Sequence, residues 1–440
     1  MRRKASPLTP LPRARGTKVA KTVPMAQTVP MKVAARMMAA RVPSTRVVAT
    51  LEVTAEALTQ TMATKANFLI LLNIISHLSA GVRFFAYFCG IITNVMIHLE
   101  SDYNNGAHEA VLRHLVETNA ERTQSYGDDS FSEQARTLIR EACEAPDAQI
   151  WFLAGGTQTN ATIIDCALQP YEGVLCAETA HINVHEAGAV EFTGHKVIAL
   201  PAHEGKLAVG DLLAWLKAYF ADDTAEHMVR PGMVYITFPT ELGTLYTADE
   251  LRALHEVCRQ YGLLLYVDGA RLAYGLAASE DVTLPLLAQL ADIFYIGGTK
   301  CGALCGEAVV FPRGNAPSHM LSRIKRHGAL LAKSRVVGVQ FEALFTKVDG
   351  EPLYMTIGRQ AVALAMRLRS LFVGRMGYQP FIDSPTNQQF YIIPNDDLTR
   401  LRQHIGFEVW CPMDEHHTAC RFVTSWATTN DEIDTLDGVM

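Results

Sequence analysis

A single lysine among small residues is the side chain in this sequence with the clearest chemical meaning. Lys300 lies in the segment Tyr-Ile-Gly-Gly-Thr-Lys-Cys-Gly-Ala, residues 295–303, directly after an apolar run. A lysine on a protein surface usually has charged neighbours, whereas Lys300 has glycines on both sides. Apolar surroundings favour the neutral, nucleophilic amine that forms a Schiff base with a carbonyl carbon. Lys300 is therefore predicted to be a catalytic amine, and an ordinary surface lysine is the alternative.

A carboxylate ends another apolar run. Asp268 lies in Tyr-Val-Asp-Gly-Ala-Arg, residues 266–271. A carboxylate beside the nitrogen of a pyridine ring keeps that nitrogen protonated, and the positive ring then accepts electron density from a substrate carbanion. The alternative for Asp268 is an ordinary helix cap.

Two glycines mark a third position of interest, in Ala-Gly-Gly-Thr-Gln-Thr-Asn, residues 154–160. Glycines let backbone N–H groups approach an anion, and the N-terminus of a helix adds partial positive charge, so Gly156 and Thr157 are predicted to bind a phosphate. An ordinary strand-to-helix turn is the alternative. The spacing Gly-x-Gly-x-x-Gly is absent, which argues strongly against a nicotinamide-binding protein.

The elements that would position these residues are short apolar runs that alternate with amphipathic helical patterns. This alternation is typical of strand–helix units in a parallel sheet, where ligands bind beyond the carboxyl ends of the strands. The fold class is therefore predicted to be α/β, with a seven-stranded, mostly parallel sheet and helices on both faces. The predicted strands are 148–153, 173–177, 196–200, 233–238, 263–267, 293–296 and 308–311.

Helical patterns and a change of pattern near Gly350 complete the outline. Helices are predicted at 159–168, at 248–260, where Thr247 and Glu250 form a capping box, and at 360–376. Short strands follow around 389–393 and 421–425. These patterns predict a large domain over 100–349 and a small C-terminal α+β domain over 350–440.

Residues 1–99 differ in composition from the rest of the chain. They hold many Lys and Arg and no acid before Glu52, which resembles an organellar transit peptide, although Pro interrupts any amphipathic helix. The apolar stretch 68–99 is broken by Arg83, and each half is shorter than the roughly 20 residues of a spanning helix. Membrane contact through this stretch is not favoured. A targeting segment, a poorly ordered extension and a wrongly assigned start of the coding sequence remain as alternatives.

Composition narrows the class of protein and its partners. The chain has 440 residues, of which 49% are hydrophobic and 19% charged, and it carries a net charge of -6. This is typical of a globular enzyme without attraction for nucleic acid, whose partners are small molecules or other copies of itself. Nine cysteines are scattered without metal-ligand spacing, so we expect no metal and a reducing compartment.

The ordered motifs closely resemble those of the threonine aldolases, which belong to the β-eliminating-lyase group of fold-type-I pyridoxal-phosphate enzymes. The Gly-Gly-Thr turn, Asp-Gly-Ala-Arg and Thr-Lys-x-Gly-Ala all take part, together with Ala-His-Ile-Asn-Val-His-Glu-Ala-Gly at 180–188. The resemblance also includes Ser101-Asp102, Tyr-Gly-Asp-Asp at 126–129 and Arg-Phe-Val-Thr-Ser-Trp from Arg421. It covers the chain from about Ser101 to the C-terminus.

The resemblance implies a role for each matching residue toward pyridoxal 5'-phosphate. Lys300 would hold the cofactor as a Schiff base, Asp268 would pair with its ring nitrogen, and Gly156 and Thr157 would bind its phosphate. His181 would stack on the ring, where a buried structural histidine is the alternative, and His185 would support it from behind.

Two arginines match positions near the cofactor's phenolic oxygen and the substrate carboxylate, namely Arg271 and Arg421, and Ser101 would help at the same carboxylate. A planar guanidinium suits bidentate binding of a carboxylate, and a structural salt bridge is the alternative. The chain departs from many threonine aldolases at Pro-Thr-Glu-Leu-Gly, residues 239–243, where Glu241 replaces a histidine that can contact the β-hydroxyl. Glu241 is a candidate base, or else an exposed loop acid.

The implied reaction is cleavage of L-β-hydroxy-α-amino acids such as threonine, allo-threonine and phenylserine to glycine and an aldehyde. A β-eliminating lyase, a transaminase and a racemase use the same cofactor and remain alternatives. Relatives with this fold build each site from two chains, which implies a homodimer or homotetramer, with Tyr126, Arg323, Lys325 and Arg326 as candidates to reach a neighbour's phosphate. A solvated basic face is the alternative for the last three. The expected location is the cytoplasm, or the mitochondrion if residues 1–99 act as a targeting segment.

Overall fold

The structure is a computed structural model that describes residues 96–439. The targeting and membrane interpretations of the N-terminal extension therefore fall almost wholly outside the described residues. No helix in the described part of the chain is long and apolar enough to cross a bilayer.

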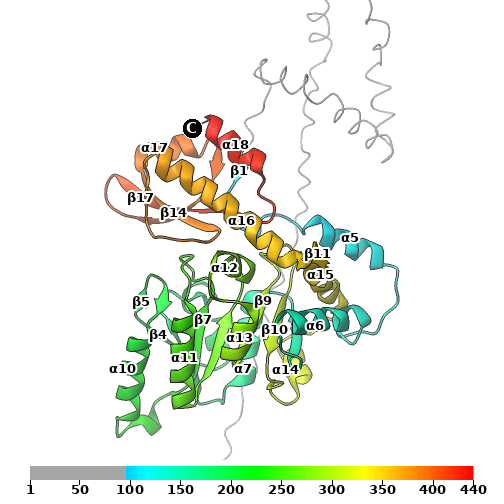
Figure 1. The fold of residues 1–440 in the computed structure, drawn as a ribbon. Coiled ribbons are helices and arrows are strands. Elements are labelled where there is room, and N and C mark those ends of the chain that lie inside the picture. The colour runs from blue at the N-terminus through cyan, green and yellow to red at the C-terminus, as the bar shows by residue number, and fades with distance from the viewer. Residues whose placement is uncertain (1–95, 440) are drawn as a thin grey trace, which may run out of the picture. The chain divides into compact units, whose positions relative to one another are not determined.

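A seven-stranded sheet forms the centre of the large domain (Figure 1). Its order is β2-β10-β9-β8-β7-β3-β4, and β10 runs antiparallel to both neighbours while the other pairs are parallel. All seven predicted strands are confirmed, with small changes at their ends. The strands are β2 (Gln149–Leu153), β3 (Glu172–Ala177), β4 (Val197–Leu200), β7 (Arg230–Thr237), β8 (Leu264–Asp268), β9 (Ile293–Gly297) and β10 (Glu307–Phe311).

Helices cover both faces of this sheet, which explains why its strands read as continuous apolar runs. Side chains alternate along β8, so that Leu265 and Val267 belong to one buried cluster while Tyr266 belongs to the other. The first cluster includes side chains of α6 (Ser130–Ala142), α10 (Val209–Phe220), α11 (Ala248–Tyr261), α12 (Leu272–Ala278), α13 (Leu284–Leu290) and α15 (Arg335–Phe345). The second includes side chains of α7 (Gly156–Ala167), α8 (His181–Val184), α9 (Ala189–Phe192) and α14 (Met320–Arg326).

The predicted helices exist, but two begin earlier than expected. The capping box of Thr247 and Glu250 opens α11 as predicted. The helix predicted from Thr159 begins instead at Gly156, because the residues interpreted as a turn already form its first helical turn. The helix predicted at 360–376 is α16, Leu353–Arg369, followed by a π-helical turn at Ser370–Arg375. Pro352 supplies its start signal, since proline has no N–H to leave unpaired there.

The C-terminal domain is built on a four-stranded antiparallel sheet of order β13-β14-β17-β16, over which α16 lies (Figure 1). Its strands and other helices are β13 (Gln379–Pro380), β14 (Gln388–Pro394), β16 (Glu408–Pro412), β17 (His417–Val423), α17 (Asn395–Leu401) and α18 (Asn430–Val439). The two predicted strands correspond to β14 and β17, although β17 begins and ends earlier than predicted.

The first described residues pack into this C-terminal domain. Strand β1 (Ile97–His98) pairs in parallel with β15 (Ile405–Gly406), and Ile97 and Leu99 are buried in the domain's core. These two residues lie in the stretch interpreted from sequence as an extension. The remaining elements are α5 (Glu109–Thr118), β5 (Ala202–His203), β6 (Lys206–Leu207), a 3-10 turn at Ala225–His227, β11 (Lys347–Val348) and β12 (Glu351–Pro352).

Candidate active site

One cavity, of about 400 Å³, gathers most of the residues predicted to act in chemistry. It opens beyond the carboxyl ends of the parallel strands, and residues of the small domain's β16 and β17 complete it. A volume of this size is typical of small-molecule sites. Its lining includes Gly156, Thr157, His181, His185, Glu241, Asp268, Arg271, Lys300 and Arg421. Ser101 is the one predicted substrate contact that does not line it.

Lys300 follows β9 and lies in the cavity with its amine desolvated. Burial and the nearby charge of Arg271 lower the pKa of Lys300, and the carboxylates of Asp102, Glu241 and Asp268 oppose this shift only in part. The hydroxyl of Tyr274 fixes the backbone by donating to the Lys300 carbonyl at 2.6 Å. The amine is therefore held in place and shifted toward its nucleophilic, neutral form.

Asp268 ends β8 and is 3% exposed. Its Oδ2 accepts hydrogen bonds from the Tyr235 hydroxyl at 2.5 Å and from Asn160 Nδ2 at 2.9 Å, and its Oδ1 accepts from the Ala270 N–H. None of the ion pairs among the described residues includes Asp268. The protein thus buries a carboxylate beside the cavity without giving it a cation of its own.

His181 and Glu186 extend the same network. Asn160 Nδ2 also donates to Glu186 Oε1 at 2.7 Å, and the His181 ring lies 2.7 Å from the same oxygen through Nδ1. Burial alone would lower the pKa of His181, but the bond to Glu186 and the charges of Glu241 and Asp268 raise it. Burial also raises the pKa of Glu186, so the pair retains a proton and the imidazole keeps a fixed orientation at the cavity wall.

The N-terminus of α7 forms another wall, because Gly156 and Thr157 occupy its first turn. A Cβ at Gly156 would lie 3.3 Å from the Tyr295 hydroxyl, so the backbone passes close to that wall. The N-cap, Gly155, makes no side-chain hydrogen bond to the first turn. Backbone N–H groups at this end of the helix are suited to an anion.

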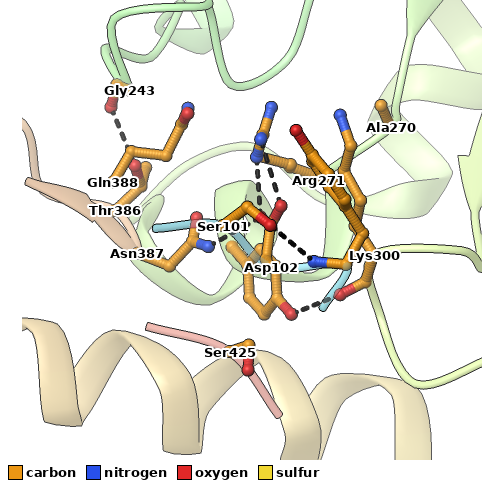
Figure 2. A network of polar contacts seen from close by, with 12 residues as sticks. Ser101, Asp102, Gly243, Ala270, Arg271, Lys300, Thr386, Asn387, Gln388 and Ser425 are labelled. Carbon is orange, nitrogen blue, oxygen red and sulfur yellow. Dashed lines mark hydrogen bonds and ion pairs between the residues drawn. The ribbon is translucent and has the colours of Figure 1, made fainter. Parts of the chain in front are cut away.

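Arg271 lines the cavity and forms a buried ion pair with Asp102 (Figure 2). Its Nε and Nη2 donate to the two carboxylate oxygens at 2.7 and 3.1 Å, and Asn387 Nδ2 donates to Asp102 at 3.0 Å. Burial would raise the pKa of Asp102, but Arg271 and Lys300 lower it. The pair holds the guanidinium in one orientation, while Ser101 donates to Asn104 instead of facing the cavity.

Arg421 reaches the cavity from β17. Its Nη2 pairs with Glu408, its Nη1 donates to Gln388 at 3.1 Å, and its guanidinium lies 5.6 Å from the centroid of the Trp410 ring. Its Nε is buried and makes no hydrogen bond. The planar guanidinium of Arg421 thus lies beside the cavity, and its Nε–H group has no hydrogen-bond partner.

The loop that carries Glu241 is tied to the small domain (Figure 2). The Gly243 carbonyl accepts from Ser384 and Thr386, and the Thr240 carbonyl accepts from Gln388 Nε2 at 3.3 Å. Because these bonds come from β14 and the residues before it, the small domain sets the position of Glu241. Glu241 is half-buried and faces the cavity.

The remaining predicted residues lie outside the cavity, on or near α14. Lys325 Nζ lies 4.5 Å from the centroid of the Tyr126 ring, and these two residues line a separate surface pocket. Arg323 donates to the Cys166 carbonyl, and Arg326 pairs with Asp165.

Asp165 also belongs to a group of potential metal ligands. Its carboxylate, the Cys166 thiol and His327 lie within 4.8 Å of one another. His327 and Arg326 already pair with the carboxylate, and burial raises the pKa of the Cys166 thiol to about 11. Local spacing did not predict this group because His327 is distant in sequence.

Sequence reasoning missed several residues of the cavity and its network. Asn160 and Glu186 lie in quoted motifs, and their polarity within otherwise buried segments was an available signal. Tyr266 and Thr299 also lie within these motifs. The others come from distant elements without a local motif, namely Tyr103, Tyr235, Glu307, Glu408 and Trp410.

Comparison with known proteins agrees with this geometry. A model of the beta-eliminating lyase family matches residues 98–382. A low specificity L-threonine aldolase of Pseudomonas aeruginosa is 28% identical, over 76% of this chain and 94% of its own length. The solved structure of Leishmania major threonine aldolase is 36% identical with a TM-score of 0.73, covering 78% of this chain and all of that one.

More distant structures share the fold alone. A structure titled as a putative aromatic amino acid beta-eliminating lyase/threonine aldolase from Exiguobacterium has a TM-score of 0.60 at 17% identity, with 79% of this chain and 96% of that chain covered. The architecture is therefore that of fold-type-I enzymes. The match to the family model and the similarity to the Leishmania major structure together show that the chain belongs to the beta-eliminating lyase family, in its threonine aldolase group. It is a pyridoxal-phosphate-dependent lyase.

Proposed function

We propose that this chain binds pyridoxal 5'-phosphate in the 400 Å³ cavity and cleaves L-β-hydroxy-α-amino acids to glycine and an aldehyde. Threonine, allo-threonine and phenylserine are the expected substrates. The observation that carries the proposal is the joint presence of a desolvated amine, Lys300, and a buried carboxylate without a cationic partner, Asp268, in one cavity.

The residues present fit this cofactor. Asp268 would balance its charge by pairing with a protonated ring nitrogen. Lys300 would bind the carbonyl carbon, and His181, oriented by Glu186, would lie against the ring. Gly156 and Thr157 would hold the phosphate at the start of α7.

When bound, the cofactor supplies an electron sink that stabilises negative charge at the substrate's α-carbon. The chain's own residues decide which bond at that carbon breaks, by fixing the orientation of the substrate. Arg421 would grip the carboxylate with its planar guanidinium, and Arg271, held by Asp102, would supply further positive charge.

Glu241 is the proposed base for the proton of the β-hydroxyl group. It replaces the histidine found at this position in many threonine aldolases, it faces the cavity, and the small domain fixes its loop. Removal of that proton lets the Cα–Cβ bond break toward an aldehyde. The amide variant Glu241→Gln should therefore lower turnover with the same affinity for the cofactor.

The decisive test is to incubate the purified protein with the three substrates and with serine, and to identify the products. Glycine and the matching aldehyde are expected. Pyruvate and ammonia from serine, without glycine from the other amino acids, would instead identify an eliminating lyase. Borohydride reduction and peptide mapping should place a pyridoxyl group on Lys300, and a Lys300→Ala chain should lack it.

We also propose that the protein works as a homodimer or homotetramer with shared sites. Tyr126 and Lys325 are exposed, lie together and are absent from their own chain's cavity, which supports a role toward a second copy. Tyr126 also has a left-handed backbone, with φ of 61°, a strained conformation that is concentrated at functional sites.

A reducing compartment, cytoplasmic or mitochondrial, is the location that we propose. Each cysteine in the described part of the chain is a free thiol, and most are buried. Burial raises the pKa of Cys143 and of Cys301 to about 12, so these thiols are inert packing groups.

A further inference from the structure

Glu307 is a buried carboxyl group in the cavity to which neither the motifs nor the proposed reaction assigns a role. It is the first residue of β10, and the strand register places it between Leu153, at the end of β2, and Gly297, at the end of β9. It is 3% exposed, and the ion pairs among the described residues do not include it. Glu307 thus lies between the strand ends that lead to Gly156 and to Lys300.

Two hydrogen bonds connect Glu307 with the turn before Lys300, and a third reaches the same turn from Gly306. The Gly298 N–H donates to Glu307 Oε2 at 3.0 Å, and the Thr299 hydroxyl donates to Glu307 Oε1 at 2.8 Å. The Gly306 N–H in turn donates to Thr299 Oγ1 at 3.0 Å. Thr299 itself lines the cavity.

Counting hydrogens shows that these bonds depend on the protonation of Glu307. A threonine hydroxyl has one hydrogen to donate and two lone pairs to accept with. While Glu307 is ionised, it takes the single hydrogen of Thr299. Once Glu307 is neutral, its own O–H can donate to the second lone pair of Thr299 Oγ1, since Gly306 occupies the first. The hydrogen of Thr299 then becomes free to point into the cavity.

We propose that Thr299 and Glu307 form a proton-dependent anion site at the phosphate end of the cofactor cavity, in which neutral Glu307 releases the Thr299 hydroxyl to donate to a phosphate oxygen. This inference rests on the proposed function, because the anion is the phosphate of pyridoxal phosphate. Gly156 and Thr157, which we propose to hold the same phosphate, line the same cavity.

The electrostatic surroundings place the switch in an accessible pH range. Burial raises the pKa of Glu307 to about 8, against the opposing effects of the Thr299 and Gly298 hydrogen bonds and of Lys300, while Asp268 raises it further. The other titratable neighbours have raised pKa values and stay neutral in this range, namely Tyr266, Tyr295, Cys301 and Tyr354. Above this pH, Glu307 becomes negative and takes back the Thr299 hydrogen.

The sign of the effect follows from these charges. A phosphate monoester is largely dianionic above its second pKa of about 6. As Glu307 ionises, the site loses a donor to that dianion and gains a like charge beside it. Affinity for the phosphate should therefore be full below about pH 7 and should fall as the pH rises through the pKa of Glu307.

The test compares binding of pyridoxal phosphate and of pyridoxal to the cofactor-free enzyme between about pH 7 and pH 9. Both ligands carry the same pyridine ring, so titration of Lys300 and of the ring affects them alike. Free pyridoxal also closes to an internal hemiacetal, but this equilibrium is the same for every variant and cancels when variants are compared. Their ratio of dissociation constants isolates the phosphate. In the unaltered protein, the advantage of pyridoxal phosphate should fall about tenfold or more over this range, as expected for one new negative charge nearby.

Three variants separate the parts of the switch. Glu307→Gln presents an oxygen to Gly298 and an N–H to Thr299, which imitates the neutral acid, so the advantage should stay high at both pH values. Thr299→Val should lower the advantage at both pH values, because only Gly156 and Thr157 then hold the phosphate, and Thr299→Ser should behave like the unaltered protein.

A phosphate advantage that is independent of pH in the unaltered protein would overturn the proposal without any substitution. So would a Glu307→Gln chain that is well folded by circular dichroism and keeps the full pH dependence. Failure of the proposed function looks different, since neither ligand would then give an absorbance band that Lys300→Ala removes.

Discussion

In the proposed reaction, Arg421 is the residue on which the choice of the bond that breaks depends most. Its guanidinium bonds Gln388 and Glu408 and leaves a buried Nε without a partner, so the group is held by the protein yet retains capacity for a ligand. Because Glu408 is itself partly exposed and its carboxylate resembles that of an amino acid, we expect the substrate carboxylate to compete with it for the same guanidinium.

Arg421→Lys should reduce kcat/KM for threonine by about 30-fold or more, on the order of 2 kcal/mol, because an ammonium group cannot reproduce the bidentate geometry. Steady-state kinetics on cofactor-loaded enzyme provide the measurement. Arg400→Lys, an exposed pair with Asp397 outside the cavity, is the matched control and should change little. Equal kcat/KM values for both variants would show that Arg421 has only a structural role.

At this scale, local motifs predicted the residues that end a strand. Lys300, Asp268 and Gly156 each follow an apolar run, and the carboxyl ends of parallel strands meet at one edge of the sheet. Glu307 and Glu408 could not be predicted in this way. Glu307 begins an antiparallel strand, so it reaches the same edge from its amino end, and Glu408 enters from another domain.

Among the elements, the crossing of α12 and α16 links the active site to the small domain. Helix α12 follows Arg271, and Gly358 in α16 packs against it so closely that an added Cβ would lie 2.3 Å from the Ala273 carbonyl oxygen. Tyr354 on the same helix donates to the Gly297 carbonyl at the end of β9. This close contact between the two helices therefore requires a residue without a side chain at position 358.

Gly358→Ala should lower the free energy of unfolding by about 1 to 3 kcal/mol, because the backbone oxygen cannot move aside as a side chain can. Urea denaturation followed by circular dichroism would measure this loss. Gly374→Ala is the control, since its added Cβ meets nothing within 4 Å. A stability change as small as that of the control would contradict the tight crossing.

Element types were predictable where hydrophobic period and caps agreed, as in α11 with its capping box. The boundaries of α7 and α16 were harder to predict than their type. In α7 the Gly-Gly-Thr segment has a composition typical of a turn, and only its tertiary setting makes it the first helical turn. In α16 the buried side chains of the first turns, Leu353, Tyr354 and Ile357, pack into the core of the large domain, a tertiary contact that the local sequence does not show.

At the scale of the whole molecule, β1 joins the first described residues to the C-terminal domain. Ile97 is 2% exposed and Leu99 is fully buried, both within the core of the C-terminal domain. The motifs begin near Ser101, and motif position alone would therefore suggest that a chain starting there folds and works. Packing changes that expectation, because two buried side chains would be lost.

A chain that begins at Met96 should keep full stability, whereas one that begins at Ser101 should be less stable by several kcal/mol, from the loss of about 2 kcal/mol or more for each buried aliphatic side chain. Thermal unfolding and turnover of the two truncated proteins should be compared. Equal melting temperatures would show that the β1 contacts contribute little.

Shared sites can be tested by mixing two inactive or weakened chains. If Tyr126 serves a neighbour's site, a Lys300→Ala chain mixed with a Tyr126→Phe chain should form some sites with both residues intact. Activity should then exceed the sum of the separate chains. Mixing without any gain, or a fully active monomer in sedimentation, would exclude shared sites.

The parallel pairing of β1 with β15 also imposes an order on biosynthesis. Ile97 leaves the ribosome before every strand of the large sheet, whereas its partner Ile405 leaves only near the end of translation. Domains fold as units during synthesis, so the large domain can fold and bring Lys300 and Asp268 together first. Ile97 and Leu99 become buried only later, when the C-terminal domain has been made. Arg421 is translated later than Ile405. A nascent chain released early would therefore contain Lys300, the proposed cofactor amine, without Arg421, the residue proposed to bind the substrate carboxylate. Only completed chains would contain both.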